Sequence, residues 1–126
     1  KENTINIFQT DKKLRKQIMG IATDSTPLEA PKDPDTCNVF ALYKIMASEE
    51  QIAEMRKNYE AGGYGYGHAK QALFELVRDK FAGPREKYEY YINNLEEVDK
   101  ALSIGAEKAK SVANEVLAKV RTKLGY

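Results

Sequence analysis

The regular spacing of apolar residues is the strongest constraint on what this chain can fold into. In the C-terminal segment, apolar side chains recur at intervals of one, three and four, which places them on one face of an α-helix. These residues are Ala109, Val112, Ala113, Val116, Leu117, Val120 and Leu124. A second stripe comprises Ala69, Ala72, Leu73, Leu76, Val77 and Phe81. Strand signals are few, so the spacing predicts an all-α fold.

Local signals set the expected ends of these helices. Ser48 with Gln51 three residues later fits a capping box, and Gly62-Gly63 can adopt the left-handed backbone that closes a helix. Gly83-Pro84 should kink or break the long middle helix, because proline lacks a backbone donor. We expect helices over 10–22, 37–46, 48–61, 95–104 and from 105 onward. The long middle helix starts near 68 and continues after that break over 85–93. The result is a small bundle of about five to six helices, with the nearly all-apolar helix over 37–46 at its centre.

Composition excludes several classes of protein. The 20 lysine and arginine residues nearly balance 19 aspartate and glutamate residues, for a net charge of +1. This balance argues against a strongly basic nucleic-acid module and against an acidic disordered tail, and we expect no DNA partner. No segment resembles a membrane-spanning helix or a secretory signal. We therefore expect a cytoplasmic protein without a membrane partner, and the first residue, Lys1, suggests a piece of a longer chain.

Few residues have the pattern of a catalytic or metal site. The single Cys37 and single His68 form neither a disulfide nor a zinc site of familiar spacing, so no metal ligand and no catalytic residue is assigned. We interpret His68 as an exposed residue at a helix start. Cys37 is either a thiol activated by the start of a helix or, the favoured reading, a small core residue.

Two other segments have both a structural and a binding interpretation. The glycine run at 62–67 with Lys70 is either a phosphate-binding turn or, by default, a helix connection. The aromatic and basic residues at 85–91 either stack on bases or cover the edge of a core. Lysines and arginines flank the apolar stripe of the last helix, where they are either solvated or contact phosphates. They are Lys108, Lys110, Lys119, Arg121 and Lys123.

Five motifs in series carry a family resemblance. They are Asn3-Thr4-Ile5, Thr23-Asp24-Ser25, the segment 33–43, the segment 61–70 and Gly105-Ala106-Glu107-Lys108-Ala109. In this order and at these intervals they resemble the C-terminal part of bacterial tryptophanyl-tRNA synthetases over essentially the whole chain. In that family a signature loop, K-M-S-K-S, precedes the first motif. The resemblance thus implies that residues 1–9 are the remnant of the linker after that loop. Residues 10–126 would then form the helical anticodon-binding domain.

The same resemblance implies a function. The full-length parent would use ATP and Mg²⁺ to attach tryptophan to its tRNA, and would be a homodimer. This part alone is expected to need no cofactor and to be inactive, because the nucleotide-binding half is not among these residues. Its expected role is to bind the tRNA anticodon through two helix starts, whose residues are Asp35, Thr36, Cys37, Asn38, Tyr66 and Lys70. Asp35 would accept a hydrogen bond from a cytosine amino group and Lys70 would hold phosphate. The alternative is a free-standing helical domain that binds protein through its tyrosine-rich helix.

Overall fold

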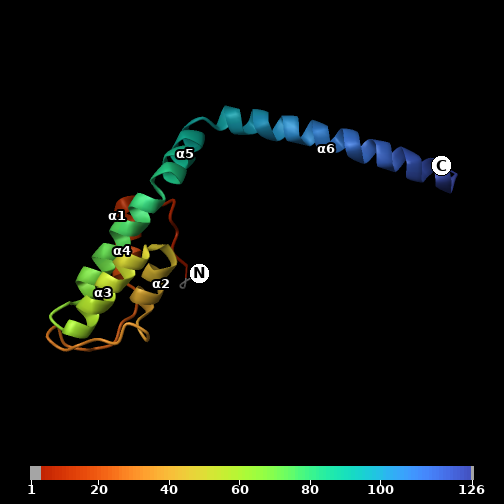
Figure 1. Cartoon of the computed structure of the whole chain (residues 1–126). Helices are drawn as coiled ribbons and strands as arrows, with labels where there is room; N and C mark the ends of the chain where they lie inside the picture. The colour runs from red at the N-terminus through yellow and green to blue at the C-terminus, as the bar shows by residue number, and fades with distance from the viewer. Residues whose placement is uncertain (1–3, 126) are drawn as a thin grey trace. The chain divides into compact units, whose positions relative to one another are not determined.

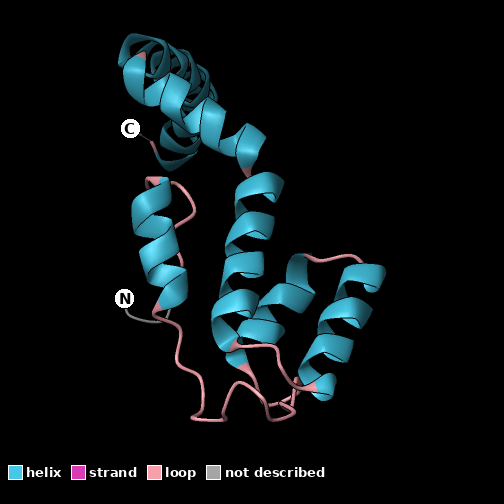
Figure 2. Ribbon diagram, turned by 90° about the vertical axis from the view of Figure 1, so that its left-hand side faces the viewer, coloured by secondary structure: helices cyan, strands magenta, loops and turns pink. Residues whose placement is uncertain are grey.

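The computed structural model describes residues 4–125, and within this range helices are joined by loops without any strand. Figures 1 and 2 show the arrangement along the chain. The helices are α1 (Asp11–Met19), α2 (Asn38–Met46), α3 (Glu49–Ala61), α4 (Tyr66–Lys80), α5 (Ala82–Asn93) and α6 (Leu95–Leu124). The predicted all-α fold of about five to six helices is confirmed.

The chain divides into two compact units within α5. The first unit ends at Arg85 and the second begins at Glu86. The domain boundary expected after residue 9 stays a prediction, and the first three residues of that segment lie outside the described range. Further along it, Ile5 and Ile7 are partly buried and pack against the core of the first unit. This segment therefore contributes apolar surface to the first unit.

Helices α1 to α4 enclose the core of the first unit. Helix α4 packs against both α1 and α2, and α2 also contacts α3. Tyr59 of α3 is fully buried, with its ring centroid 5.6 Å from that of Phe40 and 6.1 Å from that of Tyr66. The buried apolar residues are Leu14, Ile18, Cys37, Val39, Phe40, Tyr43, Met55, Tyr59, Ala69, Leu73, Phe74 and Val77. Each large side chain among them contributes about 1.5–3 kcal/mol by leaving water, so this cluster supplies the main folding energy of the unit.

Several helix ends agree with the local signals and others do not. The capping box of α3 is present, since the Gln51 backbone N–H donates to Ser48 Oγ at 3.3 Å and the Ser48 N–H donates to Gln51 Oε1 at 2.9 Å. Helix α1 ends at Met19, three residues earlier than expected. The break between α4 and α5 falls at Phe81, ahead of Gly83-Pro84. Pro84 instead lies in the first turn of α5, where its missing N–H has no intrahelical partner to lose.

The expected pair of helices over 95–104 and from 105 onward is wrong, because α6 is one continuous helix of 30 residues. Gly105 lies in its interior. A glycine there costs about 1 kcal/mol relative to alanine, which a long helix tolerates. Asn94 directly precedes the helix and forms no side-chain cap hydrogen bond.

Helix α2 is less central than its composition suggests. Val39, Phe40 and Tyr43 are buried, but Ile45 is 76% exposed. One face of α2 therefore contacts the core while the other faces solvent. The expectation that α2 would lie buried at the centre is wrong, because its packing against α3 and α4 leaves Ile45 exposed to solvent.

A long loop between α1 and α2 closes one end of the first unit (Figure 2). Lys32 is the buried charged residue of this loop, and its Nζ donates to the carbonyl oxygens of Pro27, Leu28 and Ala30 at 2.9, 3.1 and 3.1 Å. Its backbone N–H donates to the Tyr59 carbonyl at 2.7 Å. These bonds fold the loop onto the end of α3 and place the residues before α2.

Residues of the second unit are largely exposed to solvent. Neither α5 nor α6 contains a buried residue. Tyr88, Tyr90 and Tyr91 of α5 are all exposed, so they do not cover a core edge. No helix in residues 4–125 combines the length and the apolar character needed to cross a membrane.

Candidate functional site

A surface pocket of about 280 Å³ in the first unit gathers most of the predicted site residues. Its lining residues are Ala22, Thr23, Asp24, Thr36, Cys37, Asn38 and Tyr66. Four of these, Thr36, Cys37, Asn38 and Tyr66, belong to the set expected from the sequence. Asp35 and Lys70 do not line the pocket. We call this cavity the α2–α4 pocket, after the two helix starts that form it.

The α2 side of the pocket is ordered by a compact turn at residues 33–37. The Asp35 backbone N–H donates to Asp33 Oδ1 at 2.9 Å, and the Cys37 N–H donates to the Pro34 carbonyl at 3.4 Å. Thr36 Oγ1 donates to the Asp33 carbonyl at 3.4 Å. Asx turns of this kind are typical of segments that lead into a helix. The turn therefore fixes the position of Thr36 and of the first residue of α2.

Asn38 is the first residue of α2 and reaches across the pocket. Its Nδ2 donates to the Ala22 carbonyl at 3.4 Å, a long bond to the loop that follows α1. Asn38 also lines a second cavity of about 560 Å³ together with Gly20, Ile21 and Leu42. The amide thus lies between the two cavities and is exposed to solvent.

The α4 side of the pocket is set by Tyr66 and Asp24. Tyr66 Oη donates to Asp24 Oδ1 at 2.8 Å, and the Thr26 backbone N–H donates to the same oxygen at 2.8 Å. Hydrogen bonds from Thr26 and then Tyr66 lower the pKa of Asp24 below its usual value. Burial, with a further contribution from Asp24, raises the pKa of Tyr66 to about 12. At neutral pH the pocket therefore holds a carboxylate beside a neutral phenol.

Cys37 is a structural residue of this site. Its side chain is buried, and Sγ lies 3.4 Å from the Tyr59 hydroxyl. Burial raises the pKa of Tyr59 well above its usual range, so Tyr59 stays neutral. The interpretation of Cys37 as a core residue is confirmed.

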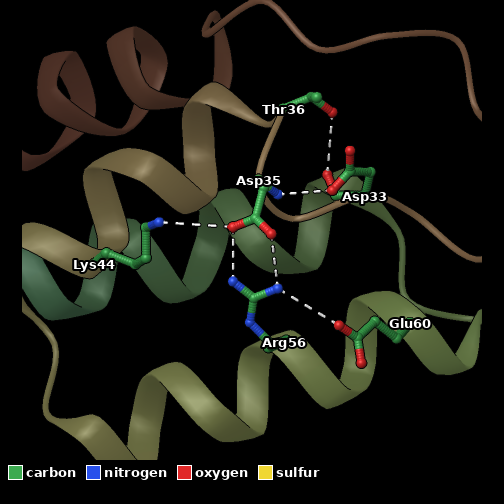
Figure 3. A network of polar contacts seen from close by, with 6 residues as sticks. All are labelled: Asp33, Asp35, Thr36, Lys44, Arg56 and Glu60. Atoms are coloured by element: carbon green, nitrogen blue, oxygen red, sulfur yellow. Dashed lines mark hydrogen bonds and ion pairs between the residues drawn. The ribbon is translucent and has the colours of Figure 1, made fainter.

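Asp35 lies beside the pocket in a polar network on the surface (Figure 3). Its two carboxylate oxygens accept hydrogen bonds from Arg56 at 2.7 and 3.0 Å, and Lys44 Nζ lies 3.8 Å from Oδ1. The hydrogen bonds from Arg56 hold the pKa of Asp35 below its usual value. Arg56 also approaches Glu60 at 3.5 Å. With Asp33, which accepts from the Asp35 backbone N–H, the network contains three acidic and two basic residues and is therefore not arranged to attract phosphate.

Lys70 and the glycine run have structural roles as well. Lys70 Nζ donates to the Met19 carbonyl at 3.1 Å, which links α4 to the end of α1. Gly62 has a φ of +76°, and a Cβ there would lie 2.4 Å from the Glu29 carbonyl oxygen. Only glycine fits this close approach. His68 is exposed, as expected, with its ring 5.6 Å from that of Tyr64.

Asp24 is the residue that sequence reasoning does not assign to the site. In the sequence it stands out only as part of Thr23-Asp24-Ser25, one of the five motifs. Its partner Tyr66 is 42 positions away in the chain, so no local spacing connects the two. The signal available in the sequence is the motif itself. Among residues 4–125, no group of three or more histidine, cysteine, aspartate or glutamate residues is placed to hold a metal ion.

Comparisons with known proteins give a consistent family, although no family model matches the chain. A tryptophan–tRNA ligase from Campylobacter jejuni strain RM1221 is 44% identical over 124 residues, which are 98% of this chain but 39% of that protein. A tryptophan–tRNA ligase from Fusobacterium nucleatum is 41% identical over 123 residues, which are 98% of this chain and 38% of that protein. The chain thus spans about two fifths of the length of these relatives and corresponds to their C-terminal part.

Solved structures agree with the sequence comparison. The crystal structure of tryptophanyl-tRNA synthetase from Campylobacter jejuni matches 99% of this chain with a TM-score of 0.94 at 43% identity. A second crystal structure of that enzyme, complexed with ADP and tryptophan, matches equally well. The matched part covers 40% and 39% of those chains. The family resemblance of the five motifs is confirmed.

Proposed function

We infer, from the premise that this chain belongs to the tryptophan–tRNA ligase family and corresponds to its C-terminal part, that the first unit binds the anticodon stem and loop of a tRNA. The observation that carries this proposal is the α2–α4 pocket, where four of the six residues expected at the two helix starts meet in one cavity. Three chain segments far apart in sequence form it. Bases in a single-stranded loop are recognised by splaying them into such sites.

The chemistry of the pocket suits an unpaired base with an exocyclic amino group. The Asp24 carboxylate accepts such a donor, as acidic side chains do from the amino group of cytosine. The Asn38 amide offers both a donor and an acceptor, and its bond to the Ala22 carbonyl is long enough to be exchanged for a bond to a base. Thr36 adds a hydroxyl at the start of α2. These three groups are the proposed base contacts.

The other expected site residues support the pocket in this proposal. Asp35 bound to Arg56 holds the turn before α2, and buried Cys37 anchors the start of α2 to Tyr59. Tyr66 orients Asp24. Lys70 holds the end of α1 through Met19 and turns toward a phosphate when RNA binds.

For the complete protein we propose the activity for which its relatives are named, that of a tryptophan–tRNA ligase. It would attach tryptophan to tRNA with ATP and Mg²⁺, as a cytoplasmic homodimer. Adenylate formation depends on positioning and on electrostatic stabilisation of phosphates. We place the groups for that step outside residues 1–126, so this chain alone is expected to form no adenylate.

Titration of the chain with tRNA tests the proposal. A tRNA with the tryptophan anticodon CCA is compared with an anticodon-swapped tRNA at about 50 and about 200 mM salt, a range over which phosphate-driven binding weakens strongly. We expect tighter binding of the CCA tRNA at both salt concentrations. Equal binding of the two tRNAs would reduce the claim to phosphate contact, and no binding would contradict it.

Two matched variants locate the contact. Asn38→Ala removes a pocket amide, whereas Asn114→Ala removes an exposed amide of α6 in the second unit. We expect Asn38→Ala to weaken binding of the CCA tRNA about tenfold, the loss of one base contact of about 1–3 kcal/mol, and Asn114→Ala to leave it unchanged. Salt-insensitive binding of a protein through the exposed tyrosines of α5 would instead favour the protein-interaction alternative.

A further inference from the structure

Lys32 is buried with its charge, and its side-chain hydrogen-bond partners are neutral carbonyl oxygens. It is 4% exposed, and Nζ donates to the carbonyls of Pro27, Leu28 and Ala30 at 2.9, 3.1 and 3.1 Å. An ammonium group has three donors, so these bonds use all of them. Taking an ammonium group out of water is costly even so. An uncharged donor would close the loop at a lower desolvation cost, so the charge at this position needs a further reason.

The ammonium group of Lys32 also contacts the ring of Tyr66. Nζ lies 5.5 Å from the ring centroid, within the distance of about 6 Å at which a cation is attracted to an aromatic face. This attraction depends on the charge and is stronger away from water. The Tyr66 hydroxyl in turn donates to Asp24 Oδ1 at 2.8 Å. The ammonium group therefore holds the ring whose hydroxyl binds the pocket carboxylate.

A second route leads from Lys32 to the same carboxylate oxygen. The Thr26 backbone N–H donates to Asp24 Oδ1 at 2.8 Å, and the Pro27 carbonyl, next in the chain, accepts from Lys32 Nζ. Asp24 itself is exposed to solvent, so its position depends on these bonds rather than on packing. Both donors to Oδ1, the Tyr66 hydroxyl and the Thr26 amide, are thus held by one ammonium group.

The backbone of Lys32 ties this arrangement to the core. Its N–H donates to the carbonyl of Tyr59 at 2.7 Å, and Tyr59 is fully buried, with its ring centroid 6.1 Å from that of Tyr66. Hydrogen bonds from Thr26 and Tyr66 lower the pKa of Asp24, and the positive charge of Lys32 lowers it further. Lys32 is therefore both fixed in position and electrostatically coupled to the pocket.

We propose that Lys32 is a positioning residue for base recognition in the α2–α4 pocket, because its ammonium group sets the Asp24 carboxylate where the amino group of a base meets it. The proposal rests on the proposed tRNA function of the first unit and adds a residue that touches no RNA. Lys32 acts on Asp24 through Tyr66 and Thr26, so a base that offers no amino group gains nothing from it. Loss of the ammonium group should therefore reduce discrimination between anticodons more than it reduces tRNA binding in general.

Lys32→Met tests the proposal, because it keeps most of the side-chain length and removes the ammonium group. The titration compares the CCA tRNA with the anticodon-swapped tRNA at about 50 mM salt. We expect binding of the CCA tRNA to weaken about tenfold, as for the loss of one base contact, and binding of the swapped tRNA to change less than about twofold. A merely structural role would lower both affinities together. Equal weakening of both, or no change in either, would overturn the proposal.

Lys80→Met is the matched control, because Lys80 is also a lysine of the first unit whose Nζ donates to a backbone carbonyl, that of Met46 at 2.8 Å. It lies outside the pocket, so its substitution removes the same charge and should leave discrimination unchanged. Lys32→Gln keeps the test in force if Lys32→Met does not fold, since an amide offers two donors to the carbonyls but carries no charge. It should lose the same discrimination. Circular dichroism checks the fold of each variant, and an equal loss of discrimination in Lys80→Met would overturn the proposal.

A measurement without RNA separates this proposal from the proposed function. The Thr26 amide proton donates to the Asp24 carboxylate, so its nuclear magnetic resonance signal reports whether that bond is formed. We expect the signal to move upfield in Lys32→Met and to stay in place in Lys80→Met. If the signal moves but the unmodified chain binds both tRNAs equally, the tRNA function fails while the positioning of Asp24 by Lys32 is supported. An unmoved signal in Lys32→Met would overturn the positioning role.

Discussion

Gly62 shows how one residue fixes the loop that supports the pocket. Its backbone has φ +76° and ψ 172°, a region that essentially only glycine occupies, and the Glu29 carbonyl lies where a Cβ would be. We expect Gly62→Ala to lower the free energy of unfolding by at least about 2 kcal/mol, from backbone strain plus the displaced loop. Urea unfolding monitored by circular dichroism measures this loss.

Two neighbouring glycines serve as controls for that substitution. Gly63 has φ +75° but open space where a Cβ would lie, so Gly63→Ala should lose only the strain, about 1 kcal/mol. Gly67 lies in the first turn of α4 with no close neighbour, so Gly67→Ala should cause no loss. Equal effects at positions 62 and 63 would contradict the role of the Glu29 contact.

The ion pair of Asp35 and Arg56 makes a pH-dependent contribution to stability. Because the hydrogen bonds from Arg56 lower the pKa of Asp35 in the folded chain, the contribution is present above the pKa of the unfolded state. It is lost as the pH falls through the lower folded-state value. A double-mutant cycle of Asp35→Asn and Arg56→Met should therefore show coupling at about pH 7 that is smaller near about pH 2.5, below the usual aspartate pKa. Equal coupling at both pH values would show that the carboxylate charge is not involved.

Local signals identify some single residues of the site but not their partners. The Ser48–Gln51 cap and the glycine pair at 62 and 63 act within a few positions, so spacing is enough to predict them. The bond between Asp24 and Tyr66 joins positions 42 apart. Which carboxylate meets which phenol depends on how α4 packs against α1, and that packing is decided by the core. The site's residue types can thus be predicted, but their pairing cannot.

At the scale of elements, helix positions follow from apolar spacing and several boundaries do not. Glycine and proline predict breaks at Gly83-Pro84 and at Gly105. In the structure, Gly83-Pro84 lies in the first turn of α5 and Gly105 lies inside α6. A glycine lowers helix stability without forbidding the helix. Boundaries inside a long amphipathic segment are therefore decided by a balance of small free energies, which single residues do not reveal.

Gly105→Ala tests whether α6 is continuous in solution. Gly105 has no neighbour within 4 Å of a Cβ position, so alanine should stabilise the helix by about 0.5–1 kcal/mol. We expect greater helix content by far-ultraviolet circular dichroism and slower amide exchange over residues 101–109. Gly83→Ala, at the start of α5, is the control and should leave exchange in α6 unchanged. If Gly105→Ala also leaves exchange unchanged, α6 is already interrupted at this point in solution.

At the scale of the whole chain, amphipathic spacing predicts a helix but not what its apolar face contacts. The stripe of α4 is buried against α1 and α2, whereas the equally regular stripe of α6 is exposed in its unit. The two stripes look alike in sequence, since burial depends on which elements are available to pack. The expectation of a single helical bundle therefore did not separate the buried stripe of α4 from the exposed stripe of α6.

A chain ending at Arg85 should therefore fold by itself. Every buried apolar residue of the described range lies between Leu14 and Val77, and Arg85 retains its hydrogen bonds to the Gln9 carbonyl and Asp11. We expect residues 1–85 to unfold cooperatively, with a midpoint within a few degrees of the full chain, and to keep the tRNA binding of the first unit. Thermal unfolding and tRNA titration measure the two properties separately. Loss of cooperative unfolding would show that the second unit contributes to the core, whereas a folded product that no longer binds tRNA would show that the second unit contributes to binding.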